Sequence, residues 1–126
     1  FMLTARAENF LHGRADIKDT VRRLQAFQEA GADVLFAPGL ATVDDIRAVT
    51  SSVDRPVNAL MGPRGITVTE LAKLGVKRVS VGGALARAAL GALLQGGREM
   101  REQGTFGFTA GSPSFRELTG IFSQRG

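Results

Sequence analysis

The feature that most constrains the fold is a regular alternation of short apolar segments with segments of helical length. The apolar segments lie at residues 1–5, 33–36, 57–60 and 77–81, and each is followed by a stretch long enough for a helix. Such alternation predicts parallel strands joined by right-handed helical crossovers. Their apolar character on both faces is typical of parallel strands covered by helices. The sequence therefore predicts an α/β fold of four βα units, with a further helix near the C-terminus.

Capping residues mark where the predicted helices begin. Three positions, each ahead of apolar residues at helical spacing, carry a side chain of the capping type. They are Asp16, Thr42 and Thr67, the last forming a capping box with Glu70. A long Ala- and Leu-rich helix is expected over 84–103. Ser112 and Pro113 predict the start of the last helix, with Ser112 as N-cap and Pro113 as the first helical residue.

Two architectures contain this alternation: a small doubly wound sheet and a (βα)8 barrel. The Gly-x-Gly-x-x-Gly pattern does not follow the first predicted strand, which argues against a dinucleotide-binding fold. A whole (βα)8 barrel needs about 250 residues. With 126 residues, the chain can form either a small doubly wound sheet or four of the eight units of a barrel.

Composition excludes several kinds of site and partner. The chain has no cysteine, which excludes disulfides, thiolate catalysis and Cys-based zinc sites. The net charge is +4, but the arginines are spread along the chain and Trp and Tyr are absent, which argues against nucleic-acid binding. No apolar run approaches the roughly 18 residues of a membrane helix. We expect a cytoplasmic enzyme or part of one, without a nucleic-acid or membrane partner.

The first predicted strand ends with an arginine and a carboxylate, Arg6 and Glu8. They lie two residues apart, so in an extended chain both side chains point to the same side. An arginine at a strand end suits a carboxylate or phosphate, which its planar fork can hold with two hydrogen bonds. The alternative is that Arg6 and Glu8 only pair with neighbouring structural charges. The residues favour neither interpretation over the other.

Other candidate positions follow the third and fourth predicted strands. Gly82 and Gly83 place backbone N–H groups at a helix start, where they attract anions, although glycine there can also serve close helix packing. Asn58 lies in an apolar strand and needs hydrogen-bond partners if buried, so a structural role is the more common outcome. Ser80 ends the fourth strand. His12, the single histidine, lies beside Gly13 in a loop and is expected to be solvated.

Five segments together resemble the C-terminal half of the phosphoenolpyruvate mutase and isocitrate lyase superfamily, in the same order and spacing. They are "LTARAEN", "RLQAFQEAGADVLFAPGL", "RPVNAL", "ELAKLGVKRVSVGGALARAA" and "GTFGF". The similarity is greatest to the mutase-like, carboxyvinyl-carboxyphosphonate phosphorylmutase-like members. The resemblance implies a (βα)8 TIM barrel, of which the chain supplies the last four βα units plus a C-terminal helix. Residues 1–103 then form half of the barrel, and 104–126 form a loop and a terminal helix that packs on a neighbouring subunit.

The resemblance also implies a chemistry. Members of the superfamily make or break a C–C or P–C bond in a small 2-oxo or 2-hydroxy carboxylic acid, and they use Mg²⁺. The resemblance places the Mg²⁺ ligands in an N-terminal half that precedes the fifth barrel strand, where this chain begins. We therefore expect no metal ligand in the chain and no activity from it alone. A homo-oligomer is implied as well, a tetramer or dimer of dimers.

Site residues follow from the matching motifs. Arg6, in Thr-Ala-Arg, matches the catalytic arginine that binds the substrate carboxylate or phosphonate, with Glu8 as a further candidate. Ser80 matches a hydroxyl position that lines the substrate pocket, and Gly82 and Gly83 match the turn after the eighth strand.

Two positions depart from the superfamily pattern. Pro38 stands where the lyases carry a glutamate and the mutase a histidine, and Leu60 stands where the lyases carry an asparagine. Asn58, two residues earlier, is expected to point into the barrel one layer deeper and to line the substrate pocket. Both departures argue against a true isocitrate or methylisocitrate lyase and against the mutase itself.

Two further interpretations stay open at this point. The chain could be a catalytically inactive half-barrel that self-associates and at most binds a small anion at Arg6 and Gly82-Gly83. It could also be the phosphate-binding half of another (βα)8 enzyme. The substrate and the reaction type, whether mutase, lyase, decarboxylase or hydrolase, do not follow from these residues.

Overall fold

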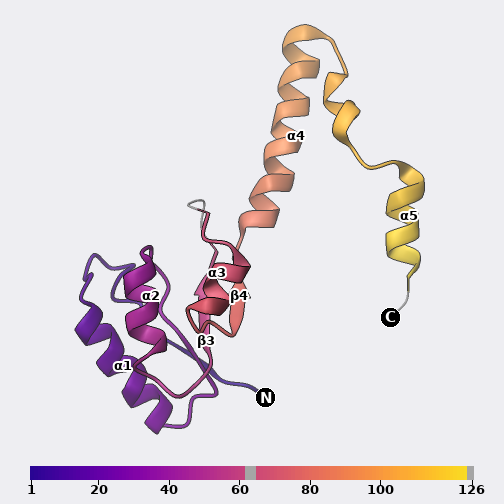
Figure 1. The fold of residues 1–126 in the computed structure, drawn as a ribbon. Coiled ribbons are helices and arrows are strands. Elements are labelled where there is room, and N and C mark those ends of the chain that lie inside the picture. Colours follow the sequence, from indigo (N-terminus) through magenta and orange to yellow (C-terminus); the bar gives the residue numbers. More distant parts are fainter. Residues whose placement is uncertain (62–64, 125–126) are drawn as a thin grey trace. The chain divides into compact units, whose positions relative to one another are not determined.

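The computed structural model describes residues 1–61 and 65–124, and the chain divides into two compact units, 1–82 and 83–126 (Figure 1). The sequence also predicts a loop over residues 61–65, of which 62–64 lie outside the described residues. The sequence placed the division between 103 and 104, in the context of a whole barrel, and that boundary stays a prediction. Each unit is described by itself.

The first unit alternates strands and helices as predicted. Its strands form one parallel sheet in the order β1-β2-β3-β4, with each strand paired to the next one along the chain. Sequential order without a switch point excludes the doubly wound alternative. The elements are β1 (Thr4–Arg6), α1 (Ile17–Glu29), β2 (Val34–Phe36), α2 (Val43–Thr50), β3 (Val57–Leu60), α3 (Val68–Lys73) and β4 (Arg78–Ser80).

The helices begin where the capping residues predicted. The Asp16 carboxylate accepts the N–H groups of Lys18 and Asp19, and Thr42 accepts that of Asp45. Thr67 and Glu70 form the expected capping box at α3. Side-chain oxygens at these positions satisfy N–H groups that the first helical turn leaves without partners.

The first strand is shorter than predicted. Residues 1–5 were expected to form a buried strand, but the strand starts at Thr4, and Phe1, Met2 and Leu3 are exposed. Pairing with β2 begins at Thr4 opposite Val34, and the Val34 N–H donates to the Leu3 carbonyl as the first bond of this ladder. Because β2 itself begins at Val34, the residues before Thr4 have no partner strand. Apolar composition alone therefore misplaced the start of the strand.

One face of the sheet is covered by helices and holds the core. Leu24 of α1, Leu35 of β2 and Val49 of α2 are fully buried there, and they pack with Val57 and Ala7. A second cluster joins Ile46, Leu71 and Val76.

The opposite face, here called the inner face, is mixed and not apolar as the sequence suggested. Because side chains alternate along each strand, this face carries Thr4, Arg6, Val34, Phe36, Asn58, Leu60, Arg78 and Ser80.

The second unit consists of α4 (Ala84–Gln103), a 3-10 helix (Gly107–Gly111) and α5 (Phe115–Ser123). The Glu99 carboxylate fixes the turn after α4, accepting from the Thr105 hydroxyl at 2.6 Å and from the N–H groups of Gly107 and Phe108. The hydrogen bond from Thr105, with those two backbone bonds, holds the pKa of Glu99 below the ordinary 4.5.

The start of the last helix differs from its prediction. Ser114, and not Ser112, is the N-cap, and Pro113 precedes the helix. Ser114 and Glu117 form a capping box, in which the Ser114 hydroxyl accepts the Glu117 N–H and the Glu117 carboxylate accepts the Ser114 N–H. Two N–H groups are satisfied in this way, which Ser112 followed by proline does not offer.

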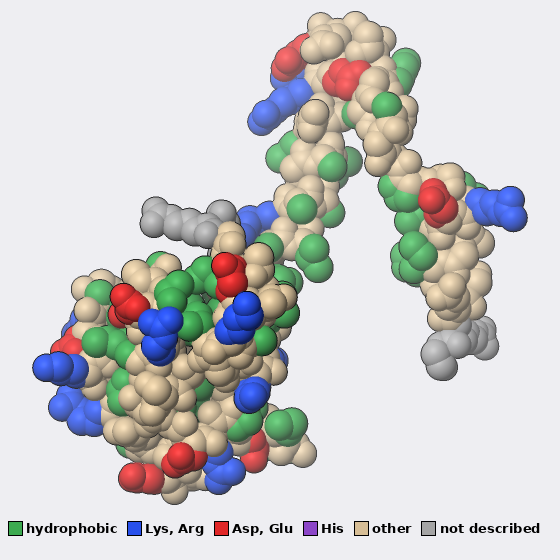
Figure 2. Space-filling model, viewed as in Figure 1, with side chains coloured by type: hydrophobic (Ala, Val, Ile, Leu, Met, Phe, Trp, Pro, Cys, Tyr) green, Lys and Arg blue, Asp and Glu red, His purple; other side chains and the backbone are tan. Residues whose placement is uncertain are grey.

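Apolar side chains stand on the surface of α4 and α5 (Figure 2). They are Leu85, Leu90, Leu93, Leu94, Phe115, Leu118, Ile121 and Phe122. Across residues 1–61 and 65–124, the helices include none with the length and apolar character needed to cross a membrane.

Candidate functional site

Arg6 stands at the carboxyl end of β1, on the inner face. Its guanidinium carbon lies 5.1 Å from the centre of the Phe36 ring, at the paired position on β2. This is the geometry of a cation–π contact, and it fixes the direction of the side chain. The other fixed contact is with Glu8, whose Oε1 lies 2.5 Å from Nη2. The sequence left open whether these two charges pair, and the structure shows that they pair with each other.

Arg6 keeps donors for a further ligand. A guanidinium has five N–H donors, and the contact with Glu8 is made through Nη2. The Arg6 side chain is 51% exposed, so an anion can reach it. Glu8 in turn lies between Arg6 and His12, whose Nε2 is 3.8 Å from the second carboxylate oxygen. His12 is largely exposed, as expected for a loop histidine.

Asn58 and Ser80 form a second pair on the same face. Asn58 is 3% exposed, and its side-chain N–H donates to the Ser80 hydroxyl at 3.0 Å. The side-chain oxygen of Asn58 is buried without a hydrogen-bond partner among the described residues. The sequence predicted that a buried Asn58 would need partners, and Ser80 is one of them.

Strand register places the two pairs on one side of the sheet. Arg6 is paired with Phe36, Phe36 with Asn58, and Leu60 with Ser80. Paired residues of parallel strands point to the same face. In the part of the chain that the structure describes, no hydrogen bond joins the Arg6–Glu8 pair directly to the Asn58–Ser80 pair.

The two glycines after β4 fall in different units. Gly82 closes the first unit with φ +52°, and a Cβ there would lie 3.6 Å from Leu60 Cδ1. Gly83 opens the second unit as the N-cap of α4, and no side chain caps that helix start. The predicted anion-binding role of Gly82 and Gly83 stays a prediction.

The loop after β2 carries Pro38, one of the two departures noted in the sequence. Pro38 is buried at the end of β2, so this position presents no acid or base. Gly39 follows with φ +96°, and a Cβ there would lie 2.9 Å from Phe10 Cβ. The loops after β1 and β2 therefore pack closely against each other.

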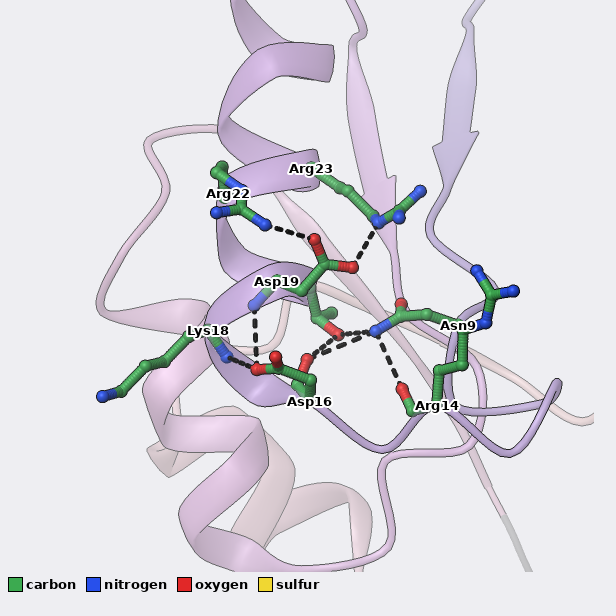
Figure 3. Close-up of polar contacts among 8 residues, drawn as sticks. Asn9, Arg14, Asp16, Lys18, Asp19, Arg22 and Arg23 are labelled. Carbon is green, nitrogen blue, oxygen red and sulfur yellow. Dashed lines mark hydrogen bonds and ion pairs between the residues drawn. The ribbon is translucent and has the colours of Figure 1, made fainter.

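Asn9, which sequence reasoning did not select, fixes the loop that follows Arg6 and Glu8 (Figure 3). It is 7% exposed, and its side-chain N–H groups donate to the Arg14 and Asp16 carbonyls, each at 3.2 Å, and to the Thr20 hydroxyl at 2.5 Å. The Thr20 hydroxyl itself donates to the Asp16 carbonyl at 2.8 Å. The loop is thereby tied to the start of α1.

Charges around the start of α1 are paired locally (Figure 3). Hydrogen bonds from Arg23 first, and then from Arg22, hold the pKa of Asp19 below its ordinary value. Asp16 accepts backbone N–H groups as the N-cap. These acidic groups are engaged in the helix start.

The residues present do not suit a magnesium site. Within the described ranges, no group of three or more His, Asp or Glu side chains is placed to hold a metal ion. Mg²⁺ prefers carboxylate oxygens in octahedral geometry.

The comparisons with known proteins agree with this architecture. A protein of Burkholderia cenocepacia J2315 described as a lyase/mutase is 57% identical, with a TM-score of 0.91 over 98% of this chain and 45% of that one. A phosphonopyruvate hydrolase, solved with oxalate and Mg²⁺, is 29% identical, with a TM-score of 0.76 over 97% of this chain and 45% of that one.

Curated sequences match over a shorter stretch. An uncharacterized protein of Mycobacterium tuberculosis H37Rv is 37% identical over 64% of this chain. The chain spans 31% of that relative and less than half of the two solved structures. Its sheet corresponds to the last four βα units of a TIM barrel, as the sequence predicted.

The sequence model for phosphoenolpyruvate phosphomutase matches residues 1–101, which is most of the chain. This match agrees with the parallel sheet of sequential strand order, with the arginine at the end of β1 and with the solved relatives. The chain belongs to the phosphoenolpyruvate phosphomutase family, within the phosphoenolpyruvate mutase and isocitrate lyase superfamily.

Proposed function

We propose that this chain supplies the carboxylate-binding side of a lyase-type active site that acts on a small 2-oxo or 2-hydroxy acid. The observation that carries the proposal is Arg6, which stands at the carboxyl end of β1 with its direction fixed by Phe36 and with donors to spare. Active sites of (βα)8 barrels lie at this end of the strands. In this proposal the whole protein makes or breaks a C–C or P–C bond and uses Mg²⁺ held outside this chain.

Each inner-face residue then has a part that its contacts support. The Arg6 guanidinium binds one carboxylate of the substrate with charge-assisted hydrogen bonds. The Ser80 hydroxyl is oriented by the N–H of Asn58 and keeps its own proton for a substrate oxygen. Glu8 shares Arg6 with the substrate, and so it sets how much positive charge the substrate meets.

The ligand bound to one relative supports a small carboxylic acid as the substrate class. The phosphonopyruvate hydrolase was solved with oxalate, a small dicarboxylate, together with Mg²⁺. Pro38 leaves the end of β2 without an acid or base. We propose that the reaction takes its proton transfers from other parts of the protein, and that it is neither isocitrate cleavage nor the mutase reaction.

The test uses a barrel in which this chain replaces the matching segment of the B. cenocepacia lyase/mutase, called here the grafted barrel. The 57% identity and the TM-score of 0.91 make that graft a conservative one. We expect Mg²⁺-dependent turnover of phosphonopyruvate or of another small 2-oxo or 2-hydroxy acid. Arg6→Ala should lower kcat/KM about 100-fold, as loss of a hydrogen-bonded charge pair does.

A matched control is Arg22→Ala, which removes another exposed arginine, one that pairs with Asp19 on α1. Its kinetics should match the parent. Unchanged kinetics in Arg6→Ala would show that Arg6 is structural and would remove the main support for the proposal.

A second candidate function is a catalytically inactive half-barrel that self-associates. It is favoured by the apolar side chains exposed on α4 and α5, such as Leu93, Phe115 and Phe122. We propose that these faces pack on other copies of the chain, giving a homo-oligomer. Inactivity of the grafted barrel towards every acid tried, with oxalate bound weakly or not at all, would favour this second candidate.

A further inference from the structure

Arg78 reaches across the inner face of the sheet. It stands at the start of β4, where it is paired with Asn58. Its Nη1 donates to the hydroxyl of Thr4 at 3.1 Å, although Thr4 lies 74 residues earlier, in β1. Strands β1 and β4 form opposite edges of the sheet. In a flat sheet, strands three places apart are separated by about 14 Å, more than an arginine side chain spans. The bond therefore requires the strong curvature of a barrel wall.

The positive charge of Arg78 has no carboxylate beside it. Arg6 on the same face is paired with Glu8, but no ion pair to Arg78 exists in the described part of the chain. Arg6 and Glu8 from β1 and the segment after it are the other charged side chains on this side, and β2 and β3 contribute none. Thr4 offers only a neutral hydroxyl. The inner face thus carries one uncompensated guanidinium.

Arg78 itself is exposed in this chain, but residues beside it on the inner face are already buried. Asn58, directly opposite in register, is 3% exposed, and its side-chain oxygen is buried without a partner among the described residues. Val34 and Phe36 on the same face are also buried. In a closed barrel this face is the packed interior. A desolvated guanidinium there is strongly unfavourable unless an anion pairs with it.

Depth along the strands indicates where that anion comes from. Arg78 stands two residues before Ser80, and Thr4 stands two residues before Arg6. Both therefore lie one inward layer below the strand ends, whereas substrates of (βα)8 enzymes bind above those ends. At the depth of Arg78 a side-chain carboxylate of the protein is the partner that a barrel interior supplies, and the oxalate measurement below separates it from a substrate carboxylate.

We propose that Arg78 pairs with the carboxylate of an Asp or Glu side chain that points inward from the strands completing the barrel. The inner face is then a docking surface for those strands, and it requires a carboxylate from them. It accepts strands that bring one buried negative charge to the layer of Arg78 and Thr4. This inference rests on the barrel fold and not on the proposed reaction.

The test compares Arg78→Met, Arg78→Lys and Thr4→Val in the grafted barrel, with the melting temperature measured from pH 5 to pH 8 and the affinity for oxalate measured with Mg²⁺. Arg78→Met leaves a buried carboxylate unpaired, which raises its folded pKa. We therefore expect a melting temperature lower by about 6 °C or more at pH 8, and a smaller loss at pH 5. Arg78→Lys should recover part of the loss, and oxalate affinity should stay within about twofold of the parent.

Two outcomes would overturn the proposal. A pH-independent loss that Thr4→Val reproduces would mean that Arg78 only braces the edge strands. An unchanged melting temperature with about tenfold weaker oxalate binding would assign Arg78 to the substrate. If Arg78→Met does not fold, a crystal structure of the unaltered grafted barrel decides, since a side-chain carboxylate should lie within about 4 Å of the guanidinium. Its absence would refute the pairing.

Discussion

Replacing Asn9 with alanine should destabilise the protein more than a change at an ordinary loop residue, because Asn9 is buried at the centre of a hydrogen-bond network. Its amide donates to two carbonyls and to the Thr20 hydroxyl, and Thr20 is fully buried. Alanine removes all three hydrogen bonds, leaves the buried Thr20 hydroxyl oxygen without its donor and opens a small void, while both carbonyls keep other donors. Unsatisfied buried polar groups cost about 1–3 kcal/mol. Since the Thr20 hydroxyl keeps its bond to Asp16, we expect a loss of about 2 kcal/mol.

The assay is urea unfolding of the grafted barrel, with Arg14→Ala as the matched control. Arg14 receives the Asn9 bond only through its backbone carbonyl, so truncating its side chain should leave the free energy of unfolding within about 0.5 kcal/mol of the parent. Asn9→Asp, which places oxygens against three acceptors, should lose at least as much as Asn9→Ala. A free energy of unfolding for Asn9→Ala equal to that of Arg14→Ala would refute this reasoning.

Further predictions concern the ion pair, the loop after β2, the turn of the second unit and assembly. Glu8→Gln should strengthen oxalate binding several-fold in calorimetry, because Arg6 no longer shares its charge; weaker binding would mean that Glu8 orients Arg6. Gly39→Ala should lower the free energy of unfolding by about 2 kcal/mol, since φ is +96° and the new Cβ meets Phe10; an unchanged value would contradict this. The depressed pKa of Glu99 means that its stabilising contribution is present above pH 4.5 and is lost as pH falls. The protection of the amides at 105–108, expressed relative to their intrinsic exchange rates, should therefore fall on acidification in the parent but not in Glu99→Gln; equal pH profiles would contradict it. Sedimentation of the chain alone should show an oligomer, and a stable 13.3 kDa monomer with a cooperative melt would contradict that.

Much of the fold could be predicted because its signals are local. Caps such as Asp16 and Thr67 act within one helical turn, and short apolar segments at regular spacing specify a parallel sheet in sequential order. The errors came where local signals compete. Ser112-Pro113 and Ser114-x-x-Glu117 both mark a helix start, and the second satisfies more N–H groups. At residues 1–3, apolar composition predicted burial, although pairing with β2 starts only at Thr4.

The site was predictable in its parts but not in its contacts. Alternation along a strand placed Arg6 and Glu8 on the same side, and their pairing agrees with that. The contacts of Arg78 with Thr4 and of Asn9 with Thr20 were not predictable, because they join residues 74 and 11 positions apart. Such bonds depend on sheet curvature and loop path, for which a single sequence holds no local signal.

The most direct test of the carboxylate-binding role of Arg6 is a crystal structure of the grafted barrel with Mg²⁺ and oxalate. We predict an oxalate carboxylate within hydrogen-bond distance of the Arg6 guanidinium, while Phe36 and Glu8 still contact Arg6 as they do in this structure. The Ser80 hydroxyl should lie on the same side of the bound oxalate as Asn58. Oxalate bound without any contact to Arg6, with the guanidinium held by Glu8 alone, would contradict the account.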